Sequence, residues 1–316
     1  MSNSIKSIRP LGFPWETQDP FLFCVHHRDE FPSGNGEMRV KPEYLSGRHI
    51  GQDFTIKDGW RMYHGQTVPG FPYHPHRGFE TITINKEGVV DHSDSLGAAG
   101  RFMEGDVQWM TAGKGVQHSE MFPLLHDDRH NHMEIFQIWL NLPKVSKFVE
   151  PHFKMLWKEE IPVVVDTDEE GNKTSIDVIA GTLNGTNAPA PTPDSWAATQ
   201  DNQVGVFTIK LEANAKWTLP ATLAGINRTI YFYRGNDITI DSKVISDFCL
   251  LEVNPESSIE IQNGDTASNL LVLQGRPIGE PVAQYGPFVM NTQQEIQEAM
   301  QDYQRTEFGG WPWSQR

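Results

Sequence analysis

The chain has 316 residues and carries 41 acidic residues against 26 lysines and arginines, a formal net charge of −15. A balance this acidic disfavours direct contact with the phosphate backbone of a nucleic acid. Twenty-seven glycines and 21 prolines indicate many turns and favour a β-rich chain. No apolar run approaches the ~18 residues of a membrane span, and the first 16 residues lack the apolar centre of a secretion signal. We therefore predict a soluble cytoplasmic protein with no nucleic-acid or membrane partner.

The strands are predicted from short segments in which apolar and polar residues alternate between Gly, Asn, Asp and Pro. In chain order, these segments are 79–84, 105–110, 133–142, 175–181, 204–213, 229–235, 247–253, 258–262 and 269–275. Residues 140–155 have the character of a connector between two β-rich halves. We therefore predict an all-β chain with domains at 1–148 and 149–316. Cys24 and Cys249 each lie in an apolar stretch and are expected to be buried core thiols.

A single helix, 292–305, is predicted near the end of the sequence. Thr292 and Glu295 form a T-x-x-E capping box, which is typical of a helix start. The apolar positions that follow form one stripe at helical spacing: Ile296, Ala299, Met300 and Tyr303. We expect this helix to dock on a sheet as part of the second domain.

All 12 histidines lie in the first half of the sequence, so a histidine-built site belongs there. His74 and His76 flank a proline in YHPHRGFETITI, and alternate residues of an extended segment point to the same face. A second pair with the same spacing, His118 and Glu120, follows a Gly-rich turn. Together these residues offer three imidazoles and a carboxylate. That set suits a divalent first-row metal such as Fe(II), Mn, Ni, Cu or Zn.

Spacing leaves the carboxylate ligand open. The alternation of the strand brings Glu80 to the face of the two paired histidines, unless Gly78 introduces a bulge, so Glu80 competes with Glu120. Phe79, Trp109, Met110 and Phe136 are candidates to line the site, but by the same alternation Phe79 and Trp109 are expected to face away from it.

The remaining histidines are expected mainly in loops. His92, in HSDSLG, is expected to make turn contacts. A polar insertion, HDDRHNH, holds His126, His130 and His132, and a solvated loop is favoured there over a second metal site.

Several long motifs resemble the pirin family of the cupin superfamily: FPYHPHRGFETITI, HSDSLG, GDVQWMTAGKGVQHSEM, FQIWLNLP and EPVAQYGPFVMNTQQEIQEAMQDYQ. The resemblance implies two tandem cupin β-barrels, with metal only in the N-terminal one. It also implies that the iron ligands are His74, His76, His118 and Glu120, with Glu80 outside the ligand set. Residues 33–68, which precede the ligands, look longer than in shorter pirins. This segment is expected to shape the pocket mouth, so the substrate stays open.

The resemblance further implies an activity similar to that of quercetin 2,3-dioxygenases, which open a flavonol ring with O₂ and release carbon monoxide. In that case Fe(II) is the cofactor, and Glu120 or Glu80 accepts the proton of the flavonol hydroxyl. The alternative is a role similar to that of pirins that act as iron-dependent, redox-sensing co-regulators. Such a protein binds a protein partner without physiological catalysis, and the net negative charge is compatible with a basic partner.

Overall fold

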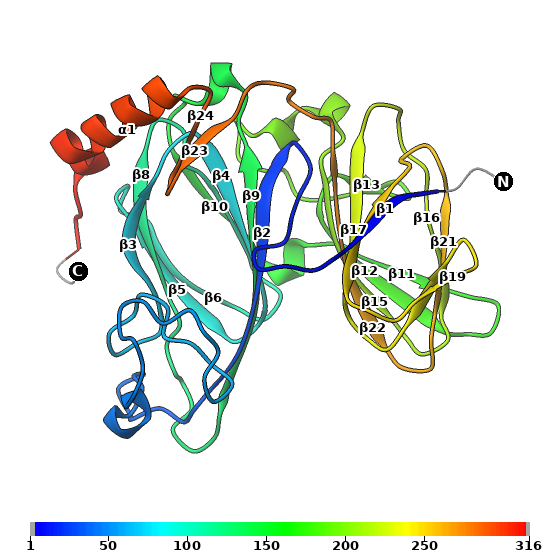
Figure 1. Ribbon diagram of the computed structural model, residues 1–316, viewed down its shortest axis with the longest axis horizontal. Coiled ribbons are helices and arrows are strands. Elements are labelled where there is room, and N and C mark those ends of the chain that lie inside the picture. Colours follow the sequence, from blue (N-terminus) through cyan, green and yellow to red (C-terminus); the bar gives the residue numbers. More distant parts are fainter. Residues whose placement is uncertain (1–3, 314–316) are drawn as a thin grey trace. The chain divides into compact units, whose positions relative to one another are not determined.

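The computed structural model describes residues 4–313, and strands are the main regular structure among them. They divide into two compact units (Figure 1). One contains the residues up to Cys24 together with Glu159–Gly279, and the other contains Val25–Lys158 with the residues from Glu280 onward. The predicted all-β class is confirmed. No helix in the described part of the chain is long and apolar enough to cross a membrane.

The unit built mainly from the second half of the chain is a two-layered β-structure. Its seven-stranded sheet has the order β1 (Ile5–Pro10), β20 (Cys249–Val253), β17 (Asn227–Arg234), β22 (Ser268–Gly275), β15 (Gly205–Leu211), β12 (Lys173–Ala180) and β11 (Val163–Thr167). A four-stranded sheet has the order β16 (Lys216–Leu219), β21 (Ile259–Asn263), β18 (Ile238–Ile240) and β19 (Lys243–Ile245). A short hairpin pairs β13 (Thr182–Leu183) with β14 (Thr186–Asn187).

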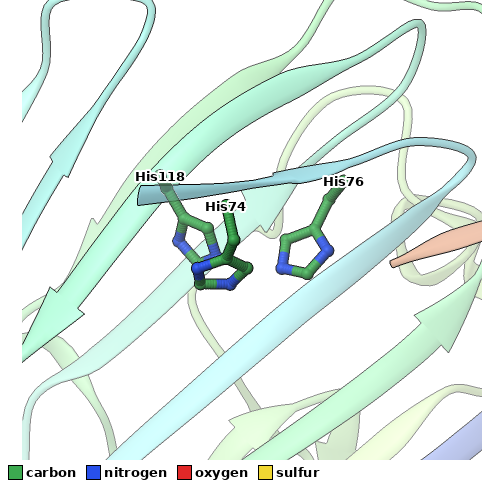
Figure 2. A group of neighbouring side chains, drawn as sticks. All are labelled: His74, His76 and His118. Carbon is green, nitrogen blue, oxygen red and sulfur yellow. The ribbon is translucent and has the colours of Figure 1, made fainter. Parts of the chain in front are cut away.

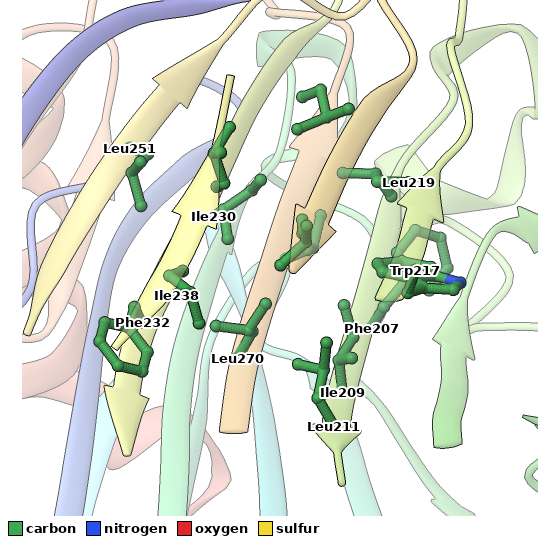
Figure 3. Packing of buried hydrophobic residues seen from close by; sticks show 14 of the residues in the cluster. Phe207, Ile209, Leu211, Trp217, Leu219, Ile230, Phe232, Ile238, Leu251 and Leu270 are labelled. Carbon is green, nitrogen blue, oxygen red and sulfur yellow. The ribbon is translucent and has the colours of Figure 1, made fainter. Parts of the chain in front are cut away.

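The core of this unit lies between its two larger sheets. Phe207 and Ile230 of the seven-stranded sheet share one buried apolar cluster with Trp217 and Leu219 of the four-stranded sheet (Figure 3). Inward-facing apolar residues alternate along each strand, as expected of strands that bury one face. No histidine occurs in this core, because every histidine of the chain precedes residue 153. Both cysteines are free and buried, as predicted.

The other unit also has two sheets. Its five-stranded sheet has the order β10 (His152–Leu156), β7 (Val107–Thr111), β4 (Phe79–Glu87), β9 (Asn131–Asn141) and β2 (Phe21–Phe31). The four-stranded sheet has the order β3 (Gly70–His76), β8 (Val116–Met121), β5 (Val89–Asp94) and β6 (Ala99–Met103). The 3₁₀ helices of the two units are Pro42–Leu45, Lys144–Ser146, Lys158–Glu160, Trp196–Ala198, Gln200–Asn202 and Glu307–Gly309.

The predicted helix is present as α1 (Gln293–Thr306), and the capping box of Thr292 and Glu295 is formed. Ile296 and Ala299 are buried against the hairpin of β23 (Ala283–Tyr285) and β24 (Phe288–Met290), as Figure 1 shows for α1 and β24. The helix is thus docked by the stripe that the sequence predicts.

The two units do not follow the boundary predicted between residues 148 and 149. The helix and its hairpin belong to the unit of Val25–Lys158, whereas β1 belongs to the other unit, where Ile8 is paired with Leu251 of β20. The predicted domains, 1–148 and 149–316, instead put the helix with the second half and residues 1–24 with the first. The difference arises because strand pairing across more than 200 residues leaves no local signal in the sequence.

Candidate metal centre

Three imidazoles meet on two neighbouring strands. His74 and His76 lie on β3 and His118 lies on β8, where His118 is the direct antiparallel partner of His74. The ring centroids of His74 lie 4.5 Å from His118 and 4.7 Å from His76, and the last two rings are 4.8 Å apart. One ring nitrogen from each residue falls within 4.8 Å of the others (Figure 2). The i, i+2 spacing on β3 therefore places both side chains on one face, as predicted.

The ring nitrogens fit a bound cation. Both nitrogens of His118 are buried and have no hydrogen-bond partner in the described part of the chain. The Nδ1–H of His74 donates to the carbonyl of Pro72 at 2.9 Å, which leaves the lone pair of Nε2 for another partner. A buried polar atom without a partner costs roughly 1–3 kcal/mol, and a metal ion held by the three imidazoles removes that cost. The donor set fits a first-row divalent metal.

Burial keeps the three imidazoles neutral. It lowers the pKa of His74 to about 4, and it lowers the pKa of His76 and His118 well below the usual value for histidine. The neighbouring imidazoles add to the shift at His118, since each protonated ring disfavours a second one. A neutral imidazole keeps the nitrogen lone pair that binds a metal.

Glu120 lies two residues beyond His118, on the same face of β8. Its carboxylate accepts a hydrogen bond from Thr83 Oγ1 at 2.8 Å and another from Gln137 Nε2 at 3.2 Å. Burial raises the pKa of this carboxyl group. Within residues 4–313, the group of possible ligand atoms that lie within 4.8 Å of one another comes from the three histidines alone, and the Glu120 carboxylate is not part of it. The assignment of Glu120 as fourth ligand therefore stays a prediction.

Glu80 lies on the opposite face of β4 from the site. Its Oε1 accepts hydrogen bonds from Thr111 Oγ1 at 2.8 Å and from Trp109 Nε1 at 3.2 Å. Thr83, which reaches Glu120, has the other parity in the same strand. The alternation does not continue across Gly78, which is the exception that the prediction leaves open. This glycine joins β3 to β4 with φ +85°, and β4 consequently turns its odd-numbered residues to the ligands.

Phe79 is therefore a site residue that we expected to face away. Its ring centroid lies 5.0 Å from that of His76, and the ring of Trp139 lies 5.5 Å from the same imidazole. Trp109 does face away from the site, as predicted, and its Nε1 reaches Glu80 there. Gln137 and Trp139 lie on β9 and were not predicted as site residues. The alternation of apolar residues along β9 does not indicate which strand it pairs with in the sheet.

His92 lies beside the centre instead of only in a turn. Its ring is 5.5 Å from that of His118, and its Nε2 lies 3.2 Å from Asp94 Oδ2. Gln108 Nε2 donates to His92 Nδ1 at 3.2 Å. The expected turn contacts of HSDSLG are made by Asp94, which accepts hydrogen bonds from the backbone of Leu96 and Ala98. Because both nitrogens of His92 are already hydrogen-bonded, the three-histidine group is the better metal site.

The sequence matches family models over both halves. The Pirin model matches residues 16–140 and the Pirin C-terminal cupin domain model matches residues 206–309. Pirin-1 of Arabidopsis thaliana is 37% identical over 242 residues, which cover 76% of this chain and 78% of that protein. Pirin of Rattus norvegicus is 34% identical over 259 residues, which cover 78% of this chain and 80% of that protein.

Solved structures agree with the family models. The crystal structure of a quercetin 2,3-dioxygenase from Acinetobacter baumannii superposes with a TM-score of 0.71 at 30% identity, and the match covers 92% of this chain and 87% of that one. A second quercetin 2,3-dioxygenase structure from the same organism, with a TM-score of 0.68 at 22% identity, supports the fold. The predicted pair of cupin domains is thereby confirmed, and the chain belongs to the pirin family.

Proposed function

We propose that the chain is an Fe(II)-dependent dioxygenase of the quercetin 2,3-dioxygenase type, with a flavonol and O₂ as substrates. The observation that carries the proposal is the group of three neighbouring imidazoles, two of them buried, with ring nitrogens left for a metal. The likeness to a quercetin 2,3-dioxygenase at 30% identity over nearly the whole chain supports the reaction class. The donor set suits Mn, Ni, Cu and Zn as well as Fe(II), so Fe(II) rests on the family resemblance.

The residues divide into those that hold the metal and those that handle the proton. His74, His76 and His118 would hold the metal, with Glu120 as the fourth ligand. Fe(II), when bound, would supply Lewis acidity toward flavonol oxygens and redox chemistry toward O₂. Because burial raises the pKa of Glu120, its carboxylate is also the group best suited to accept the proton of the flavonol hydroxyl. Thr83 and Gln137 orient that carboxylate through their hydrogen bonds.

Aromatic rings next to the ligands would hold a planar substrate and exclude water. Phe79 and Trp139 lie with their centroids 4.1 Å apart, and both contact the imidazole of His76. Phe79 is fully buried, so this side of the centre is closed to solvent. Exclusion of water strengthens the electrostatic interactions of the metal site.

Oxygen uptake tests the proposal directly. Protein purified without oxygen, loaded with Fe(II) and given quercetin should consume O₂ and release carbon monoxide, whereas His118→Ala should do neither. Iron content is measured on both samples. Absence of uptake by protein that holds stoichiometric iron would contradict the dioxygenase assignment and favour the iron-dependent co-regulator.

A further inference from the structure

We propose that the segment 32–69, which joins β2 to β3, supplies the substrate-contacting wall of the metal centre. Phe54 and His64 of this segment, together with Phe71 of β3, form a set of rings that we call the aromatic wall. The inference rests on the proposed function in one respect, namely that the ligand is a planar aromatic compound. It goes further by assigning the residues that select this ligand.

The position of the segment follows from the sheet order. β2 is the last strand of the five-stranded sheet and β3 is the last strand of the four-stranded sheet, so the segment connects two sheet edges. In the sheet orders of the described residues, no further strand lies beyond either edge. His74 on β3 and Gln137 on β9 are both partly exposed, whereas His118 is fully buried. The partly exposed residues of the site thus lie on or next to the edge strands that the segment connects.

The aromatic wall leads from the surface to a metal ligand. Phe54 is 41% exposed, and its ring centroid lies 4.9 Å from His64 and 6.3 Å from Phe71. Phe71 in turn lies 6.2 Å from His74. Phe71 is the cross-strand partner of Glu120, so its side chain is on the same face of the sheet as that carboxylate. Each ring is within the distance at which aromatic groups attract one another, so a planar ligand placed along the wall would meet successive ring faces and edges.

His64 offers the wall a hydrogen-bond acceptor for a polar group of the ligand. The Nδ1–H of His64 donates to the carbonyl of Gly51 at 2.7 Å, so the neutral ring carries its lone pair on Nε2. This nitrogen is an acceptor suited to a phenolic hydroxyl group. The wall therefore favours hydroxylated planar aromatic compounds over purely apolar ones.

The wall is held in place by a buried network beneath it. Arg61 makes two hydrogen bonds to Asp29, at 3.0 and 2.8 Å, and both side chains are buried. Tyr63, whose backbone has φ +57°, donates its hydroxyl proton to Asp29 Oδ2 and accepts from Nδ1 of His27. The ring of Tyr63 packs 5.0 Å from Phe71. Loss of one partner of such a buried pair is strongly destabilising, so the network holds the wall in place before a ligand arrives.

The test compares two exposed positions of the same segment. In Fe(II)-loaded protein kept free of oxygen, Phe54→Ala should weaken quercetin binding roughly five- to twenty-fold, the loss expected for one aromatic contact and its buried area. Ile56→Ala is the matched control, because Ile56 is 58% exposed and lies two residues away. It should bind quercetin as the parent does. Iron content and melting temperature should be unchanged in both variants. In turnover, Phe54→Ala should raise KM and leave kcat unchanged.

A second variant addresses the polar contact. His64→Ala should lower the affinity for quercetin more than the affinity for a flavone that lacks hydroxyl groups. Equal binding by Phe54→Ala and the parent would overturn the proposal, and so would equal losses in Phe54→Ala and Ile56→Ala. A parent protein that binds no planar aromatic compound would overturn it as well. Binding that depends on Phe54, but without O₂ uptake, would support the wall and contradict the dioxygenase, because binding is measured without turnover.

Discussion

At the scale of single residues, the most informative side chain is His118. It is fully buried, it lies between two other imidazoles, and neither of its nitrogens has a partner among the described residues. Such a residue stabilises the fold only when something binds it, since a buried unpaired polar group is costly. The unpaired nitrogens of His118 therefore lower the stability of the metal-free protein but leave a lone pair available to a metal.

Replacement of His118 should therefore have opposite effects on metal binding and on the stability of the metal-free protein. His118→Leu should abolish stoichiometric metal binding and leave the chelator-treated protein as stable as the parent or more so, by about 1 kcal/mol. Metal per chain and the chelated melting curve check the two parts. His92→Leu is the control, because His92 is hydrogen-bonded to Asp94 and Gln108 and its loss should destabilise. Retained stoichiometric iron in His118→Leu would contradict the metal centre.

At the scale of elements, the turn between β3 and β4 decides which residues face the metal. Gly78 has φ +85°, and a Cβ at this position would lie 2.0 Å from the carbonyl oxygen of Val289. Only glycine meets both conditions. This turn reverses the alternation between His76 and Phe79, so it brings Phe79 and Thr83 to the ligands and takes Glu80 away from them.

Alanine substitutions at two glycines distinguish the cost of a positive φ from the cost of a steric clash. Gly78→Ala should destabilise by several kcal/mol, because a steric clash adds to the cost of about 1 kcal/mol for alanine at positive φ. Gly97→Ala is the matched control: Gly97 has φ +89°, but a Cβ there would meet nothing within 4 Å. Only the conformational cost should appear in that variant. Chemical denaturation measures both, and equal losses would show that the contact with Val289 has no effect.

The turn at Gly78 separates the part of the site that the sequence predicts from the part that it does not. Histidine spacing on β3 and β8 was sufficient for the three-imidazole group, because i, i+2 alternation is a local property of a strand. The face of β4 could not be predicted, since it depends on the backbone of one glycine. Trp139 and Gln137 could not be assigned either, because the partner of β9 is set by packing between distant strands. Local periodicity likewise predicted α1 but not the unit it joins.

At the scale of the whole molecule, residues near the C-terminal end of the described chain contact positions within or directly beside the two strands that carry the histidines. Arg77 is hydrogen-bonded to Asp302 at 2.9 Å, and Tyr303 donates to Gln117 Oε1, also at 2.9 Å. Trp313 Nε1 donates to the carbonyl of Asp94 at 2.8 Å. Arg77 follows His76 and Gln117 precedes His118, so the helical segment secures the backbone that carries the ligands.

Removal of residue 292 and all that follow should therefore lower the melting temperature. The truncation exposes the apolar cluster of Phe288 and Met290 and leaves Arg77 and Gln117 without these contacts. A matched control is Glu298→Ala in the full chain, because Glu298 lies on the exposed face of α1, where its carboxylate accepts a hydrogen bond from Gln294. Scanning calorimetry compares the three proteins. An unchanged melting curve after truncation would contradict the docking role of α1.

The division of the chain between the two units also determines the order in which each unit is completed during translation. When residues 25–158 have left the ribosome, their unit still lacks β23, β24 and α1, which follow Glu159–Gly279 in the chain. At ~5–20 residues per second, synthesis of that intervening stretch takes on the order of ten seconds. The other unit has all its strands by Gly279. The unit that carries the three histidines is thus completed last, although most of its strands are synthesised before most strands of the other unit.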